Sequence, residues 1–351
     1  MKNILFIISS LHGGGAQRVV VNLANRLCRE HHVTILIFEG DPPAYDVDSA
    51  VDIRCCPEQD SRLFYRLLRF LIPLDGVSWV RKLKRELDID VSVSFMPVPN
   101  LTITFSKGRE KTIVSERSDP LMKGKKQYLT DLVTFRLADH IVFQSEQVRG
   151  YFGKSVLKKS SVILNPVGVP VRAAEVRRNR IVNAARLHPQ KNQHLLISAF
   201  SDFVRVYPDY VLDIYGTGPL ENELREQIAD LHLEEKVILH GHVRNIHEQI
   251  RDAKMFVLSS DYEGLSNALM EAMMMGLACV STRVAGSSEI IQPEENGLLT
   301  AVGDRKGLTE AMLRLAEDDR LRERLEKNAV LTSQQFRTDT ILAQWMDILE
   351  P

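Results

Sequence analysis

The sequence of 351 residues has no apolar run as long as the roughly 18 residues that a membrane-spanning helix needs. The apolar run at residues 4–8 is also too short for a signal-peptide core. It is followed by Ser-Ser-Leu-His-Gly-Gly-Gly rather than by a small-residue cleavage site. We therefore expect neither a transmembrane nor a secreted protein.

Cysteine is scarce. The four residues Cys28, Cys55, Cys56 and Cys279 show no CxxC spacing and no pairing pattern. This argues against a disulfide scaffold and against a zinc site, and it favours a reducing cytosol as the compartment.

The remaining composition is that of a soluble globular chain, with 44% hydrophobic and 26% charged residues. The length allows two domains of about 150 to 180 residues each. Disordered and fibrous classes are therefore excluded.

The net charge of −1 hides an asymmetry between the two halves. Residues 1–165 carry 24 Lys and Arg against 18 Asp and Glu, a balance of +6, whereas residues 166–351 carry 21 against 28, a balance of −7. Within residues 61–165 there are 19 basic and 10 acidic residues. The basic excess is thus concentrated in the N-terminal half.

Residues 61–73 and 81–85 contain most of the clustered arginines and lysines, and in 61–73 these alternate with leucine and phenylalanine at helical spacing. One interpretation is a basic amphipathic surface lying on anionic lipid. The other is a surface helix whose apolar stripe packs on its own domain. Nucleic acid is a poorer partner, because the pI is near neutral and basic and aromatic residues are not interleaved.

Short apolar segments alternate with helical ones along the whole chain. Strands are expected at residues 3–9, 32–38, 91–95, 112–115, 140–144 and 161–164, and again at 180–184, 210–215, 236–239, 255–259 and 278–281. Such alternation predicts an α/β fold with parallel sheets covered on both faces. We expect two doubly wound domains facing a cleft, 1–165 and 166–335, with ligands at the carboxyl ends of the strands.

A glycine loop, His12-Gly13-Gly14-Gly15-Ala16, joins the first strand to the first helix. Such a loop lets a ligand approach the backbone and the free N–H groups of the helix N-terminus. A dinucleotide fingerprint is the first alternative, but Arg18 stands where the third glycine of G-x-G-x-x-G is required. A plain tight turn is the second alternative.

The segment 261–281 carries the strongest functional pattern. It contains Glu263 after a predicted strand, a turn made by Gly264, Leu265, Ser266 and Asn267, and Glu271 about one turn inside the next helix. That helix is apolar nearly all round, as buried helices are, and a lone buried carboxylate is costly unless it is strongly hydrogen-bonded. Glu271 either accepts hydrogen bonds from ligand hydroxyls, while the turn amides hold a phosphate, or is a satisfied core glutamate. Two glutamates eight residues apart favour the ligand.

Two cations, Arg186 and Lys191, flank another predicted strand-to-helix connection. A lysine near a helix N-terminus opposes the helix dipole and is unfavourable as surface decoration. Both cations are explained if they bind a diphosphate, although a surface lysine remains the alternative. His188 between them is interpreted as a loop histidine.

Taken together, these motifs resemble those of family 4 retaining glycosyltransferases of the GT-B fold, which have two Rossmann-like domains. The resemblance extends over almost the whole chain and depends on Gly13-Gly-Gly-Ala-Gln-Arg-Val-Val, Arg186 with Lys191, Gly216-Thr-Gly-Pro-Leu220, Gly241-His-Val, the pair Glu263 and Glu271, Asn296-Gly-Leu-Leu299 and Asp304. It implies an N-terminal acceptor domain, a C-terminal nucleotide-sugar domain and a final helix, 336–351, that crosses back to the N-terminal domain.

The resemblance also implies roles for individual residues. Arg186 and Lys191 would bind the donor diphosphate, Glu271 the ribose, and Glu263 the donor sugar. The amides of Gly264, Leu265, Ser266 and Asn267 would help to hold the donor, and the loop at Gly14 and Gly15 would approach the diphosphate. Gly216 belongs to the same donor site, and Gly241, His242 and Val243 would border the base.

The chain departs from the family at Val114-Ser-Glu-Arg-Ser-Asp119, where many relatives have a histidine facing the sugar. Arg117 occupies that place, and an arginine cannot act as a base at physiological pH. A positive group there would stabilise the departing phosphate or bind the acceptor, so Arg117 and its neighbour Glu116 are assigned to the site.

Two Asp-x-Asp sequences, Asp46-Val-Asp48 and Asp88-Ile-Asp90, invite a metal-site interpretation. Arg186 and Lys191 already supply positive charge, so we expect no metal and no further cofactor.

The resemblance is to bacterial enzymes that extend lipid-linked glycans for capsule, O-antigen or glycoprotein assembly. It implies transfer of a hexose or N-acetylhexosamine, with retention, from a UDP-sugar to a polyprenyl-pyrophosphate-linked glycan. We expect a cytoplasmic protein that is peripheral on the anionic inner face of the plasma membrane. A GT-B-fold sugar-nucleotide epimerase and a non-catalytic nucleotide-sugar-binding subunit remain as alternatives.

Overall fold

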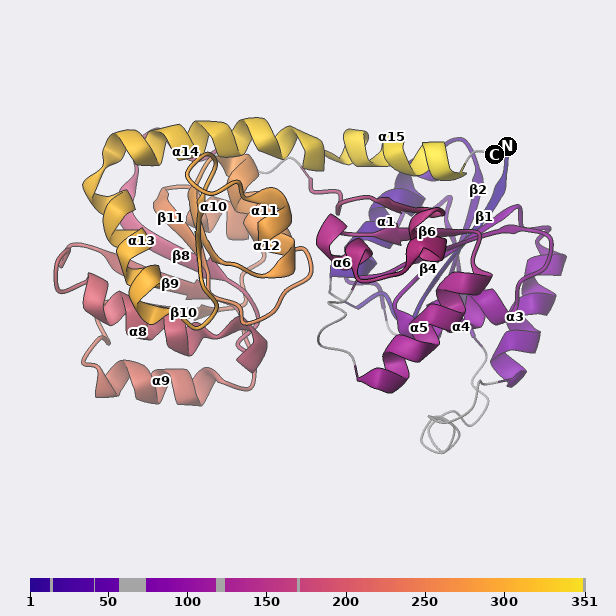
Figure 1. Cartoon of the computed structure of the whole chain (residues 1–351), viewed down its shortest axis with the longest axis horizontal. Helices are drawn as coiled ribbons and strands as arrows, with labels where there is room; N and C mark the ends of the chain where they lie inside the picture. Colours follow the sequence, from indigo (N-terminus) through magenta and orange to yellow (C-terminus); the bar gives the residue numbers. More distant parts are fainter. Residues whose placement is uncertain (13–14, 41, 57–73, 118–123, 169–170, 350–351) are drawn as a thin grey trace. The chain divides into compact units, whose positions relative to one another are not determined.

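The computed structural model describes residues 1–12, 15–40, 42–56, 74–117, 124–168 and 171–349 (Figure 1). The chain divides into two compact units. Unit 1 consists of Met1–Pro166 and Ile341–Pro351, and unit 2 consists of Val167–Thr340.

Unit 1 is built on a seven-stranded sheet of order β3-β2-β1-β4-β5-β6-β7, in which every neighbouring pair is parallel. Its strands are β1 (Asn3–Ile8), β2 (His32–Ile37), β3 (Asp52–Cys55), β4 (Val91–Phe95), β5 (Lys111–Ser115), β6 (His140–Phe143) and β7 (Ser160–Val162). Its helices are α1 (Gly15–Leu27), α3 (Leu74–Glu86), α4 (Pro97–Phe105), α5 (Lys125–Leu137), α6 (Glu146–Gly150), α7 (Lys154–Leu157) and, for most of its length, α15 (Thr338–Leu349).

The two faces of the unit 1 sheet are covered by different helices. On one face, Leu23 of α1 and Trp345 of α15 share an apolar core with Phe95 of β4, whose ring centroid lies 5.8 Å from that of Trp345. On the other face, Asn100 of α4 accepts a hydrogen bond of 2.7 Å from Ser94 of β4. Because successive strand residues point to opposite faces, α4 and α1 lie on opposite sides of the sheet.

Unit 2 contains a six-stranded parallel sheet of order β10-β9-β8-β11-β12-β13. Its strands are β8 (Arg178–Ala184), β9 (Val211–Tyr215), β10 (Val237–Gly241), β11 (Ala253–Leu258), β12 (Ala278–Thr282) and β13 (Leu298–Thr300). The helical elements are η2 (Pro189–Lys191), α8 (Gln193–Phe203), α9 (Glu221–Asp230), α10 (Ile246–Ile250), α11 (Asn267–Met275), α12 (Ala285–Ile290), α13 (Arg305–Glu317), α14 (Asp319–Thr332) and η3 (Ser333–Phe336). The predicted α/β class with two Rossmann-like parallel sheets is confirmed.

Two strands are absent from the sequence prediction. The edge strand β3 has no buried residue, so it lacks the apolar pattern that marks the others. The edge strand β13 spans only three residues, too few to show a strand pattern. Both are formed by pairing with an existing strand, which local sequence does not show.

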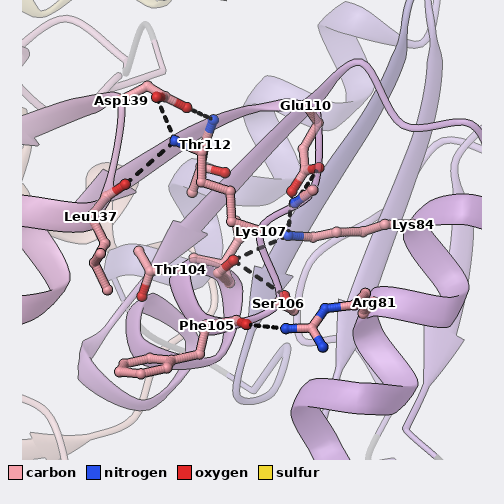
Figure 2. Close-up of polar contacts among 12 residues, drawn as sticks. Arg81, Lys84, Thr104, Phe105, Ser106, Lys107, Glu110, Thr112, Leu137 and Asp139 are labelled. Carbon is pink, nitrogen blue, oxygen red and sulfur yellow. Dashed lines mark hydrogen bonds and ion pairs between the residues drawn. The ribbon is translucent and has the colours of Figure 1, made fainter.

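A buried ion pair joins α3 to the start of β5 (Figure 2). The ammonium of Lys84 lies 2.7 Å from Oε1 of Glu110, and both side chains are 4% exposed. Lys84 also donates to the carbonyl of Ile103 (3.1 Å), and Arg81 donates to the carbonyl of Phe105 (2.6 Å). Burial lowers the pKa of Lys84, and the Glu110 carboxylate opposes that shift.

The expectation that residues 81–85 present their cations to a membrane is therefore wrong for Lys84. Its side chain points inward because a carboxylate and a helix-end carbonyl are available there, whereas Lys82 and Arg85 are exposed. Residues 61–73, the other part of that predicted surface, lie outside the described residues. No helix among the described residues is long and apolar enough to cross a membrane.

Candidate functional site

Three loops meet at the carboxyl edge of the unit 2 sheet, after β8, β9 and β10. The N–H of Ala185 donates to the carbonyl of Tyr215 (3.0 Å), and the N–H of Leu187 donates to that of Thr217 (3.0 Å). The N–H of Gly216 donates to the carbonyl of Gly241 (2.8 Å). The structure thus brings together the predicted residues Arg186, Gly216 and Gly241 through the loops that carry them.

Gly216 is required by this contact between loops. Its φ is +137°, and a Cβ there would lie 1.9 Å from the carbonyl oxygen of Ala185. A side chain at Gly218 would similarly meet the carbonyl of Leu187 at 2.2 Å. The two glycines of the Gly-Thr-Gly motif therefore let the β9 loop pass against the loop that holds Arg186.

The side chains at this edge are largely open to solvent. Arg186 is exposed, and in the described part of the chain its guanidinium has no hydrogen-bond or ion-pair partner. His242 is exposed and Val243 is half-buried. An unengaged cation beside close-packed backbone is suited to binding an anion.

Lys191 and Glu263 form an ion pair at the same edge. Their side chains are 14% and 13% exposed, and Glu263 also accepts a hydrogen bond of 3.3 Å from Ser260. Lys191 ends η2, and Asn192 next to it adopts φ +44° and caps α8 by accepting from the N–H of Leu195 (3.1 Å). The lysine is thus held beside a helix N-terminus by a carboxylate from the loop after β11.

Further hydrogen bonds fix the two loops that carry this ion pair. Asp261 accepts from Asn192 through its side chain (2.7 Å), and its N–H donates to the carbonyl of Gln190 (2.9 Å). Ser259 donates to the carbonyl of Lys191 (2.9 Å). These hydrogen bonds therefore hold loops 188–192 and 259–263 together.

The turn at Gly264, Leu265 and Ser266 leads into α11, as the sequence predicted. Ser266 is the N-cap, accepting from the N–H of Leu269, and Asn267 is the first helical residue. The first N–H groups of such a helix have no intrahelical acceptor. Gly264 is approached closely by Gly286, the second residue of α12, where a Cβ would lie 1.5 Å from its carbonyl oxygen. Sequence reasoning missed Gly286, although a glycine opening a helix after a strand is a signal of close approach.

Glu271 lies one turn inside α11 and is 8% exposed. One of its oxygens, Oε2, is 2.9 Å from Nε2 of His247 on α10. This histidine side chain is 29% exposed and was not predicted as a site residue. Nothing in the local sequence around His247 connects it to a residue 24 positions away, so only the fold identifies it.

A charged network supports the loop that begins at Gly241. Buried Asp213 of β9 accepts hydrogen bonds from Arg180 (2.7 Å) and from His240 (2.5 Å), and Arg180 also donates to Tyr215 (2.9 Å). The rings of Tyr215 and His240 stack with centroids 4.4 Å apart. Burial by itself lowers the pKa of Arg180, but the hydrogen bond and charge of Asp213, together with Tyr215 and Asp252, raise it overall. The network fixes the residues directly before Gly216 and Gly241.

The predicted residues of unit 1 lie at the carboxyl edge of its own sheet. Gly15 begins α1 after β1, whereas Gly14 lies outside the described residues. Glu116 follows β5 and is buried, and its carboxylate accepts from the N–H of Arg117 (2.8 Å).

Arg117 points into the unit rather than outward. Its guanidinium lies 4.7 Å from the ring centroid of Phe95, donates to Ser115 (2.9 Å) and contacts Asn165. Burial lowers its pKa to about 9, a shift that the charge of Glu116 opposes. One terminal nitrogen is buried and has no hydrogen-bond partner among the described residues. Arg117 is a half-buried cation at the sheet edge.

In the two Asp-x-Asp sequences, two aspartates accept backbone hydrogen bonds and a third has a positive φ. Asp90 accepts from the N–H of Asn3 (2.8 Å), Asp88 adopts φ +46°, and Asp48 accepts from the N–H of Ala50 (2.9 Å). Within the described ranges, no group of three or more His, Cys, Asp or Glu side chains is arranged to hold a metal ion.

Comparisons with known proteins fit this architecture. Residues 13–170 match the model of the family described as Glycosyltransferase Family 4, and residues 170–331 match that described as Glycosyl transferases group 1. Together the two matches span most of the chain.

Two characterised relatives are similar over nearly the full length. The GalNAc-alpha-(1->4)-GalNAc-alpha-(1->3)-diNAcBac-PP-undecaprenol alpha-1,4-N-acetyl-D-galactosaminyltransferase of Campylobacter jejuni is 26% identical, covering 99% of this chain and 98% of the relative. A lipopolysaccharide core biosynthesis glycosyltransferase of Rhizobium meliloti is 27% identical, covering 96% of both chains.

Among solved structures, HepE of Anabaena in complex with UDP and glucose superposes with a TM-score of 0.82 at 20% identity, covering 99% of both chains. At that identity the likeness concerns the fold. The family matches and the two parallel sheets lead to one conclusion: the chain belongs to the GT-B glycosyltransferases, with a family 4 domain followed by a group 1 domain.

Proposed function

We propose that this glycosyltransferase moves a hexose or N-acetylhexosamine from a UDP-sugar, with retention of anomeric configuration, to a polyprenyl-pyrophosphate-linked glycan. Two observations outside the chain support the substrates. The Campylobacter relative is named for an undecaprenyl-diphosphate-linked glycan, and the Anabaena structure contains UDP.

The observation that carries the proposal is the cationic edge of unit 2, where exposed Arg186 lies on the same sheet edge as the Lys191–Glu263 ion pair. A diphosphate bound there would receive charge-assisted hydrogen bonds from both cations. The N-terminus of α11, at Gly264 to Asn267, adds backbone N–H groups and a favourable helix dipole. Glu271, oriented by His247, would accept from the ribose hydroxyls.

The ion pair also gives the two residues distinct roles during binding. An incoming phosphate would replace Glu263 as the acceptor of hydrogen bonds from the Lys191 ammonium. Glu263 would then accept hydrogen bonds from the sugar hydroxyls. Arg186 and Lys191 would stabilise the negative charge that grows on the diphosphate as the anomeric bond breaks. The positive charge needed for this step comes from the chain, so we propose that no metal is required.

Retention follows if the acceptor attacks from the face of the leaving group and the departing phosphate takes its proton. The two-carboxylate route of retaining glycosidases needs a free nucleophilic carboxylate beside the anomeric carbon. In the donor complex Glu263 is instead assigned to accepting hydrogen bonds from the hydroxyls of the donor sugar. Unit 1, with Glu116 and Arg117 at its sheet edge, is assigned to the acceptor. An enzyme with such an acceptor would work as a peripheral protein on the inner face of the plasma membrane.

The test is product formation from a panel of UDP- and GDP-sugars with a polyprenyl-linked glycan extract, comparing the wild type with Glu263→Gln. Glu221→Gln is the matched control, because it alters a surface ion pair with Arg225 in the same unit. A larger lipid-linked product from the wild type and the control alone supports the proposal, and the anomeric configuration of that product tests retention. Activity should persist in EDTA.

Two outcomes would replace the proposal. An isomerised sugar nucleotide without transfer identifies an epimerase. Donor binding with no product from any acceptor identifies a nucleotide-sugar-binding subunit.

A further inference from the structure

Helix α5 of unit 1 has apolar side chains on two opposite faces. Its inner face contains Phe135, which is fully buried and packs edge-on against Phe143 and Phe152 with ring centroids 5.7 and 5.0 Å away. Its outer face carries Leu129, Val133 and Leu137, which are 62%, 48% and 44% exposed. A helix that covers its own core needs only one apolar face.

The three exposed residues form a continuous stripe. They are spaced four residues apart, so they follow one side of the helix for about 12 Å at 1.5 Å per residue. Helix α4 packs beside α5 (Figure 1), and its residue Val98 is 44% exposed. Exposed apolar residues in unit 2 are instead scattered over separate elements, as Val206, Ile238, Val302 and Leu331 show.

Several basic residues lie near the carboxyl end of this stripe. At the carboxyl end of α5, Arg136 is exposed, and Lys107 donates to the carbonyl of Leu137 (3.4 Å; Figure 2). Lys159 donates to the carbonyl of Arg136 (2.9 Å), and Arg109 is exposed in the loop after Lys107.

The carboxylates of the same corner are neutralised or hidden. Glu110 is buried against Lys84, and Asp139 is paired with Lys107 at 2.5 Å. Asp131 is 4% exposed and accepts from Gln127 (2.9 Å). The outward field of this corner is therefore positive, which complements an anionic surface.

We infer that the outer face of α5, with Leu129, Val133 and Leu137 beside the exposed Arg136, docks unit 1 on an anionic lipid bilayer. A shallow apolar stripe bordered by cations matches the boundary between acyl chains and charged headgroups. The inference rests on the proposed function, because a lipid-linked acceptor brings the enzyme to a bilayer. It places the docking surface on α5, whereas the sequence interpretation placed it at residues 61–73 and 81–85.

The experiment is sedimentation with vesicles of equimolar phosphatidylcholine and phosphatidylglycerol. The double variant Leu129→Gln/Val133→Gln is compared with Val206→Gln/Leu331→Gln, which removes apolar residues of similar or greater exposure from unit 2. We expect the α5 variant to lose about tenfold in vesicle partitioning, and the control to bind like the wild type. Arg136→Glu should weaken binding to these vesicles more than to phosphatidylcholine alone.

Transfer to a detergent-dispersed acceptor separates this inference from the proposed function. Unchanged transfer by the α5 variant in detergent, with lost vesicle binding, supports docking. If no protein, the wild type included, transfers sugar but the α5 variant still loses vesicle binding, the proposed function is overturned and the docking surface is not. Vesicle binding that is absent in the wild type or retained in the α5 variant overturns the inference. A variant that loses a dimer instead of vesicle binding shows that the stripe contacts a second copy, which also overturns it.

Discussion

A lysine–glutamate ion pair shielded from solvent occurs in both units, and the two pairs lie at opposite edges of their sheets. Glu110 immediately precedes β5, so the pair with Lys84 is at the amino edge of the unit 1 sheet. Lys191 and Glu263 follow β8 and β11 and lie at the carboxyl edge of the unit 2 sheet.

The two ion pairs also differ in how far they are exposed to solvent and in which groups surround them. Lys84 and Glu110 are each 4% exposed, and Lys84 also donates to the carbonyl of Ile103 near the end of α4. Lys191 and Glu263 are 14% and 13% exposed and share their edge with the exposed Arg186. Ligands of parallel α/β sheets bind at the carboxyl edge. The same two residue types therefore serve stability in one place and are proposed to serve catalysis in the other.

The largest expected effect is on the folding of unit 1. Lys84→Met leaves the Glu110 carboxylate buried without its cation, and removing one partner of such a pair costs about 3 kcal/mol or more. Urea denaturation should show this loss, and Lys84→Met/Glu110→Gln should recover part of it. Turnover of the folded enzyme should stay unchanged; a fall in turnover at full folding would erase the distinction between the pairs.

The second effect is on catalysis in unit 2. Glu263→Gln and Lys191→Ala should each lower turnover by about tenfold or more, because each removes a group that acts on the sugar or the leaving diphosphate. Steady-state kinetics on the folded variants measures this, with circular dichroism to verify folding. Wild-type turnover in both variants would show that this pair is structural too.

A smaller effect is expected at the residue that orients Glu271. His247→Ala removes one hydrogen bond to a carboxylate, so the donor KM should rise about fivefold with little change in kcat. His247→Gln can still donate and should behave more like the wild type. An equal fall in kcat for both variants would contradict a role limited to donor binding.

The smallest effect concerns pH and the cations of unit 1. Burial lowers the pKa of His140, and the charges of Lys111, Arg149 and Lys159 add to the shift. The unfolded chain then takes up a proton near the ordinary pKa of about 6.5, while the folded chain does so only at lower pH. Stability is complete above that value and declines as the pH falls. Urea titrations at about pH 7.5 and about pH 5.5 should show a smaller decline for His140→Gln than for the wild type. Equal declines would exclude His140 as a source.

Much of the fold could be predicted from the sequence. Buried strands such as β1, with five of its six residues buried, are apolar throughout and were expected. The position of Glu271 one turn inside α11 also follows from the local pattern. In contrast, β3 exposes most of its residues, and its existence depends on pairing with β2.

The sequence predicts which residues belong to the candidate site, but not which of them contact each other. Glu263 and Lys191 were singled out separately, each for its own local reason, and their ion pair joins residues 72 positions apart. Arg117 was predicted as a cation at the site, but the sequence did not show that its guanidinium would turn inward onto Phe95. His247 has no local signal at all.

The sequence by itself determined the alternation of strands and helices, the glycines that close-packed loops require, and the chemical types gathered at strand ends. These depend on local periodicity and on backbone conformation, which neighbouring residues specify. The tertiary structure decided which charges meet, which are buried, and which apolar residues stay exposed. Lys84 and Lys191 are the same residue type. Only the packing of distant segments buried Lys84 in unit 1 and placed Lys191 at the carboxyl edge of the unit 2 sheet.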